Sequence, residues 1–148
     1  MARTILGVIA GFVAWWVVVT IIDRPMRFFW PDYAAVYTAM TFTLPMMLAR
    51  LTESTIALVI AALLAARVAP ASRIAGWAFG LVLLAMFGPY HLLMIWNKFP
   101  AWYHAYFLAS LIAIPLIVTT VRRETAVAAS RAAGATDGPR LPGTSPTS

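Results

Sequence analysis

The chain has 148 residues, of which 62% are hydrophobic and 11% are charged, and its formal net charge is +6. A soluble domain carries about 25% charged residues, so this composition excludes an ordinary water-soluble globular fold. The absence of cysteine excludes disulfides, thiolate metal sites, iron–sulfur clusters and cysteine nucleophiles.

Four apolar stretches fill most of the chain, at residues 4–22, 44–69, 74–96 and 102–121. Each contains about 20 residues, which at about 1.5 Å per residue is enough to cross a hydrocarbon core of about 30 Å. In lipid, an α-helix satisfies all of its backbone hydrogen bonds within one segment. We therefore predict an all-α integral membrane protein, in which residues 1–123 form a four-helix bundle with short loops.

The first span, 4–22, is expected to end before Pro25 and Pro31, because proline interrupts helices. The aromatic residues of the following connection are suited to the lipid headgroup zone. Residues 34–43 are apolar but rich in threonine and tyrosine. We predict that they form a short helix in or near the membrane interface, before the second span.

Prolines also shape the other predicted spans. Thr43 is placed to cap the second span, and Pro45 falls in its first turn, where a missing N–H group costs little. The third span is expected to kink at Pro89, because this residue removes a backbone hydrogen bond. Pro100 lies at the start of the fourth span.

After Arg123 the composition changes. Residues 124–133 are able to continue as a helix, whereas 134–148 are mostly glycine, proline, threonine and serine. A segment with so few apolar side chains cannot bury enough surface to fold. We predict that 124–148 form a cytoplasmic tail that is mostly disordered.

The basic residues predict the orientation of the spans. One side carries Arg3, Arg67, Arg73, Arg122, Arg123, Arg131 and Arg140, and the other carries Arg24, Arg27 and Lys98. Basic residues favour the cytoplasmic side, so we expect both termini there. Arginine supplies ten of the eleven basic residues and alanine is abundant, which is typical of GC-rich bacterial genomes. The expected location is therefore the bacterial cytoplasmic, or inner, membrane.

A rival topology has five spans. In this arrangement residues 33–49 and 55–69 cross the membrane separately. We favour four spans, because residues 50–54 would have to form a very tight hairpin between two short helices.

Two glycine pairs predict close helix packing. Gly7 and Gly11 share one face of the first span, and Gly76 and Gly80 share one face of the third. Small residues four apart let two helix backbones approach closely in a membrane. We predict that these two spans pack against each other there. The alternative is a contact with a second copy of the chain.

Ionisable residues gather near the outer ends of the spans. Arg50 and Glu53 share a helix face and can pair, and Asp23, His91 and His104 lie at a similar depth. Glu53 is expected to point inward and to contact Arg50, a histidine or water. One interpretation is an ion pair that only anchors helix ends. The other is a polar pocket that binds a small molecule or relays protons. No usual metal-ligand spacing is present, so we predict no metal site.

Trp15 and Trp16 lie near the middle of the first span, away from the interfacial zones where tryptophan is enriched. We interpret them as bulky packing groups. A flat cofactor or quinone stacked against them is an alternative that nothing else in the sequence supports, so no cofactor is expected.

The sequence contains no phosphate-binding loop, nucleophile elbow or paired catalytic carboxylates. We therefore expect a non-enzymatic binding or assembly subunit for a membrane partner, a lipid or a small ligand. The alternatives are an oligomeric transporter or channel subunit, and a membrane enzyme that uses Glu53, His91 and His104. The expected partners are the lipid bilayer and either a second copy or another membrane protein. Nucleic acid is not expected, because no basic stretch is interleaved with aromatic residues.

Overall fold

Four helical segments of the computed structural model are long and apolar enough to cross a membrane. The structure describes residues 1–69 and 74–136, which contain helices and no strand. The four segments are α1 (Ala2–Phe29), α3 (Leu44–Val68), α4 (Ala75–Pro89) with its continuation η1 (Tyr90–Met94), and α5 (Ala101–Thr136). Two short helices, α2 (Pro31–Val36) and η2 (Trp96–Lys98), complete the described elements. The predicted four-span membrane fold is confirmed.

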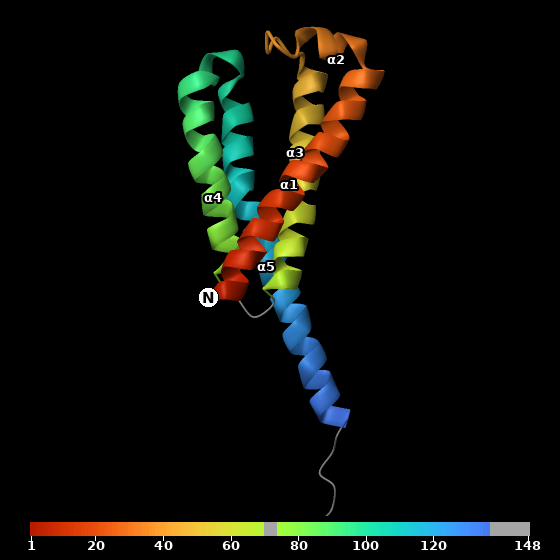
Figure 1. The fold of residues 1–148 in the computed structure, drawn as a ribbon, viewed down its shortest axis with the longest axis vertical. Helices are drawn as coiled ribbons and strands as arrows, with labels where there is room; N and C mark the ends of the chain where they lie inside the picture. The colour runs from red at the N-terminus through yellow and green to blue at the C-terminus, as the bar shows by residue number, and fades with distance from the viewer. Residues whose placement is uncertain (70–73, 137–148) are drawn as a thin grey trace, which may run out of the picture.

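The long helices form two pairs (Figure 1). α1 packs along α3, α4 packs along α5, and α3 also contacts α5. The pairs cross at the end of the molecule that carries the N-terminus, and they spread apart toward the opposite end, where α2 lies. We call the opposite end the open end of the bundle.

The contact between α1 and α3 is made by small residues. A stripe of alanines faces Gly7 and Gly11 of α1, and its members are Ala61 and Ala65 of α3 and Ala69 at the C-cap of that helix. A Cβ atom at Gly7 would lie 3.0 Å from the Ala65 carbonyl oxygen, and one at Gly11 would lie 3.2 Å from that of Ala61. Glycine therefore allows the two backbones to pack directly against each other.

The second glycine pair joins α4 to α5 instead of α1. A Cβ atom at Gly80 would lie 2.7 Å from the Leu111 carbonyl oxygen, and one at Gly76 would collide with Thr119. The two glycine pairs therefore do not meet each other, although α1 does contact α4, and a Cβ atom at Gly11 would lie 3.3 Å from the Phe79 ring. Gly7 and Gly11 face alanines of the α3 segment, whereas Gly76 and Gly80 face α5 between Leu111 and Thr119.

Two expectations about helix ends are also corrected. α1 continues past Ile22 and through Pro25 to Phe29. Pro25 removes only one amide donor, and one such loss is tolerated inside a long membrane helix. α2 begins at Pro31, earlier than predicted, because proline at the first helical position costs no hydrogen bond. Thr43 occupies the N-cap position of α3, but its side chain makes no capping hydrogen bond.

Pro89 marks a change of helix geometry, as expected. The helix changes there from α4 to η1, a π-helical turn in which the Ile95 amide donates to the Tyr90 carbonyl oxygen at 3.2 Å. The wider turn includes His91. α5 runs without interruption beyond Arg123 to Thr136, so the first part of the expected tail is helical. The remainder of that tail, residues 137–148, lies outside the described residues.

Candidate functional site

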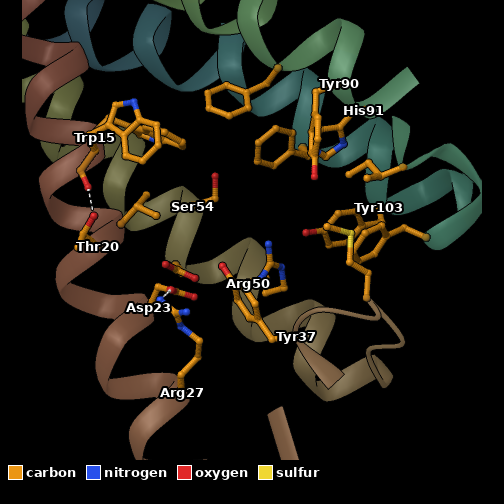
Figure 2. A pocket seen from close by; sticks show the side chains of 18 of the residues that line it. Trp15, Thr20, Asp23, Arg27, Tyr37, Arg50, Ser54, Tyr90, His91 and Tyr103 are labelled. Carbon is orange, nitrogen blue, oxygen red and sulfur yellow. Dashed lines mark hydrogen bonds and ion pairs between the residues drawn. The ribbon is translucent and has the colours of Figure 1, made fainter. Parts of the chain in front are cut away.

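A cavity of about 350 Å³ lies between the two helix pairs. It is lined by side chains of α1, α3, α4, η1 and α5, together with residues of the connection after α2. Figure 2 shows Arg50, Ser54, Tyr90 and Tyr103 pointing toward the same open space. We call this space the central cavity.

Four of the five residues predicted to form a polar cluster line the central cavity. They are Asp23 from α1, Arg50 and Glu53 from α3, and His91 from η1. The fifth, His104 on α5, does not line the cavity but contacts His91 from behind. The structure thus brings all five residues together. The α1–α3 pair contributes Asp23, Arg50 and Glu53, and the α4–α5 pair with η1 contributes the two histidines.

Arg50 and Glu53, which the sequence allows to pair, form no ion pair. The Arg50 guanidinium instead donates a hydrogen bond to the Tyr33 hydroxyl at 2.8 Å and lies 4.8 Å from the centre of the Phe42 ring. Within residues 1–69 and 74–136, the only ion pair joins Asp23 to Arg27, one turn apart on α1. Arg50 packs against the aromatic side chains of Tyr33 and Phe42. A desolvated guanidinium is stabilised both by a hydrogen bond to a phenol and by a cation–π contact with a ring face.

The Tyr33 hydroxyl lies outside the membrane-spanning helices, on α2. Its side chain is completely buried. Burial raises the pKa of Tyr33 to about 12, although the nearby charge of Arg50 opposes this rise. Tyr33 is therefore a neutral hydrogen-bond partner that holds Arg50 at the cavity wall.

Several buried polar atoms around the central cavity have no hydrogen-bond partner. Among the described residues these atoms are Trp15 Nε1, Arg27 Nε, Arg50 Nε, Glu53 Oε1 and Ser54 Oγ, and all five residues line the cavity. The Glu53 carboxylate also lies within electrostatic reach of Asp23, Arg27 and Arg50. Buried polar groups are nearly always paired, so their concentration around one cavity requires an explanation.

His91 and His104 form a buried pair at the η1 side of the cavity. Their Nδ1 atoms are 3.0 Å apart, and His104 Nε2 lies 3.2 Å from the carbonyl oxygen of Trp96. The His91 ring also stacks on Phe107, with ring centres 4.2 Å apart and planes within 6°. These contacts hold the imidazole of His91 in one orientation.

Aromatic rings form much of the remaining wall of the cavity. Trp15 packs on Phe87 with ring centres 4.9 Å apart, and Phe99 stacks on Tyr103 at 4.4 Å. The central cavity is therefore polar where Asp23, Arg50 and Glu53 gather, and aromatic elsewhere. An arrangement of apolar walls with a few convergent polar groups is typical of small-molecule sites.

A second cavity, of about 420 Å³, lies at the crossing end of the bundle between the last turns of α3 and the middle of α5. It contains Arg67, Arg122 and Arg123. In the described part of the chain, no group of three His, Cys, Asp or Glu side chains is placed to hold a metal ion.

The sequence interpretation missed several residues of the site. Ser54 and Tyr103 were not singled out, although both lie within one helical turn of a residue that was, Glu53 or His104. Trp15 was interpreted as a packing group, and it does pack, but its buried ring also lines the cavity. Ser54 lies four residues after Arg50, on the same helix face, and this spacing is the signal that would have found it.

No protein-family model, curated protein or solved structure matches the chain.

Proposed function

We propose that this small multi-pass membrane protein is a non-enzymatic binding protein that holds one small amphipathic molecule in the central cavity. The observation that carries the proposal is the set of five buried, unpaired polar atoms on cavity-lining residues. A bound polar group would supply the missing hydrogen bonds, and each unpaired buried group otherwise costs about 1–3 kcal/mol. The aromatic walls suit an apolar part of the same molecule.

The packing of the bundle favours binding over conduction. On α3, the central cavity reaches Ser54 and the second cavity begins at Ala66. The α3 residues that face the core between them are completely buried and apolar: Ala57, Leu58, Ala61, Ala62 and Ala65. A transported ion or solute would need a polar path, and this apolar layer separates the two cavities.

The location proposed for the chain is the bacterial cytoplasmic membrane, with both termini in the cytoplasm. The exposed faces of the helices support a lipid environment, since α1 alone exposes Ile5, Ile9, Val13, Val17 and Ile21. The asymmetric distribution of arginine supports the orientation. The open end would then face away from the cytoplasm.

Both glycine pairs are covered by helices of the same chain. A second copy or another membrane protein would therefore have to use a different surface, such as the lipid-facing side of α1. Binding of a small molecule does not depend on such a partner.

The proposal is tested by comparing two buried serines. Ser54 Oγ is unpaired at the cavity, whereas Ser110 Oγ donates to the Phe107 carbonyl oxygen at 2.7 Å and does not line the cavity. Protein extracted in mild detergent is analysed by native mass spectrometry for a bound small molecule. We expect Ser54→Ala to reduce the occupied fraction several-fold and Ser110→Ala to leave it unchanged.

A wild-type protein that carries no small molecule, and whose melting temperature does not respond to extracts of its own membrane, would contradict the proposal. Equal occupancy in both serine variants would show that the molecule binds somewhere other than the central cavity.

A further inference from the structure

The hydrogen bonds of the two histidines determine where their protons lie. His104 Nε2 faces the Trp96 carbonyl oxygen, which only accepts hydrogen bonds, so this nitrogen carries a hydrogen. His104 is 1% exposed, and no carboxylate of the described residues pairs with it. A positive charge on that ring would be costly, so His104 is neutral and its Nδ1 is bare. In the 3.0 Å contact between the rings, His91 Nδ1 is therefore the donor.

This arrangement leaves a lone pair on His91 Nε2. A second proton there would put a positive charge on a buried ring close to the guanidinium of Arg50. Phe107 covers one face of the ring and Tyr103 lies parallel to it at 6.3 Å, so the ring meets the cavity along an edge. The Nδ1 edge faces His104. Nε2, on the other edge, has no hydrogen-bond partner among the described residues and is an acceptor available to a molecule in the cavity.

Hydrogen-bond donors lie on another side of the same space. Figure 2 shows the Arg50 side chain across the open space from His91. Arg50 Nε and Trp15 Nε1 are both buried and unpaired. An occupant that donates to His91 and accepts from Arg50 needs polar atoms at two positions, and two oxygen atoms on one ring meet this requirement. A cavity of about 150 Å³ holds benzene, so the central cavity has room for a substituted aromatic ring between its aromatic walls.

The cavity also has a lateral opening along α1. Trp16, Thr20 and Arg24 are spaced four residues apart, so they form one stripe of the helix, and all three are exposed and line the cavity. Tyr90 of η1 is likewise exposed and lines the cavity. The stripe begins in the middle of the span and extends about 12 Å toward the interface. The opening between α1 and η1 therefore faces the hydrocarbon of the bilayer.

We infer that the occupant is a lipid-soluble molecule with a hydroxylated aromatic ring as its head, which enters from the bilayer between α1 and η1. Its hydroxyl donates to His91 Nε2, a second ring oxygen accepts from Arg50, and its apolar chain leaves through the lateral opening. This inference rests on the proposed function and adds the class of ligand and its route of entry.

The test measures binding of three probes to the wild-type protein in lipid nanodiscs, under argon, by the fluorescence of the tryptophans that line the cavity. The probes are a hydroquinone with a decyl chain, its dimethyl ether, and the same hydroquinone without the chain. Empty nanodiscs control for partitioning into lipid. The ether keeps the ring and the chain but has no hydrogen to donate. We expect the decyl hydroquinone to bind about tenfold more tightly than the ether and than the chain-free ring.

The variant His91→Phe keeps a ring for stacking on Phe107 but has no acceptor nitrogen. It should remove the preference for the hydroquinone over the ether while leaving binding of the ether close to the wild-type value. The comparison of the hydroquinone with its ether uses the wild-type protein alone. The test therefore remains valid even if the His91→Phe variant does not fold.

Equal binding of hydroquinone and ether to the wild-type protein would overturn the role of His91. Equal binding of the chain-free ring would overturn entry from the bilayer. If no probe binds while native mass spectrometry finds a different molecule in the cavity, the ligand class is wrong and the proposed function stands. If nothing occupies the cavity in either experiment, both are wrong.

Discussion

Tyr33 connects the short helix α2 to the charged part of the central cavity. Its buried hydroxyl accepts a hydrogen bond from Arg50, and burial raises its pKa to about 12, against about 10 in an unfolded chain. The folded protein therefore binds the phenol proton more tightly than the unfolded chain does, and the neutral phenol stabilises the fold. Its contribution to stability is complete below pH 10 and is lost as the pH rises from about 10 to about 12.

We expect the melting temperature of the protein in detergent to fall over this pH interval, reflecting a loss of about 2 kcal/mol. Tyr33→Phe should show a lower melting temperature at pH 8, because Arg50 loses its partner, and a smaller decline between pH 10 and 12. Tyr106→Phe is the control, since the hydroxyl of Tyr106 lies on an exposed surface. The same decline in wild type and Tyr33→Phe would show that Tyr33 does not titrate with folding.

At the residue scale, the sequence predicted the depth of the ionisable side chains in the membrane but not their hydrogen-bond partners. Counting residues from the ends of the spans placed Asp23, Arg50, Glu53 and the histidines at one level, and they do gather around one site. The sequence offered Glu53, three residues away, as a possible partner of Arg50, whereas the structure shows a hydrogen bond from Arg50 to Tyr33. Tyr33 reaches Arg50 because α2 brings it close to α3, and the spacing of residues along one helix does not predict this arrangement.

At the scale of elements, the two glycine pairs show how helix contacts depend on the partner surface. Each pair was expected to meet the other, yet Gly11 meets the alanine stripe of α3 and Gly80 meets the α5 backbone. The repeat of alanine at 57, 61, 65 and 69 was visible in the sequence and was a signal for the first contact. Pairing of the third and fourth spans had no comparable signal, because Gly76 and Gly80 meet a mixture of α5 backbone atoms and side chains of different types, such as Thr119 and Ile112.

The contact of α4 with α5 gives a prediction for Gly80→Ala. The added methyl group would lie 2.7 Å from the Leu111 carbonyl oxygen, so the two helices must separate. We expect a loss of about 1–3 kcal/mol in stability, measured by unfolding in detergent or bicelles. Gly88→Ala is the matched control, because its nearest neighbour would be a Leu84 methyl group at 3.8 Å, and its effect should stay within about 1 kcal/mol. Equal effects at both sites would contradict this packing argument.

At the scale of the whole molecule, the proposed orientation can be tested with single cysteines, because the chain contains none of its own. Lys98 and Ser130 are both exposed and lie near opposite ends of α5. In intact cells made permeable at the outer membrane, a membrane-impermeant maleimide should label Lys98→Cys. Ser130→Cys should react only after the cytoplasmic membrane is broken. The reverse pattern would show that the arginine asymmetry does not determine the orientation of this bundle.

The number and type of the spans followed from hydropathy because lipid imposes a length and a backbone geometry on every crossing segment. Hydropathy did not predict that the two helix pairs spread apart toward the open end. This spread depends on bulky rings near the open end and on small residues at the crossing end. Trp15, Phe87 and Phe107 keep the pairs apart at the central cavity, whereas glycine and alanine bring α1 and α3 together at the crossing.

The uninterrupted length of α5 has a mechanical consequence. A crossing that starts at Ala101 uses about 20 residues, so the segment from Arg122 to Thr136 extends about 22 Å past the membrane surface as a continuous rod (Figure 1). Any protein that docks on the end of this rod is held clear of the lipid headgroups.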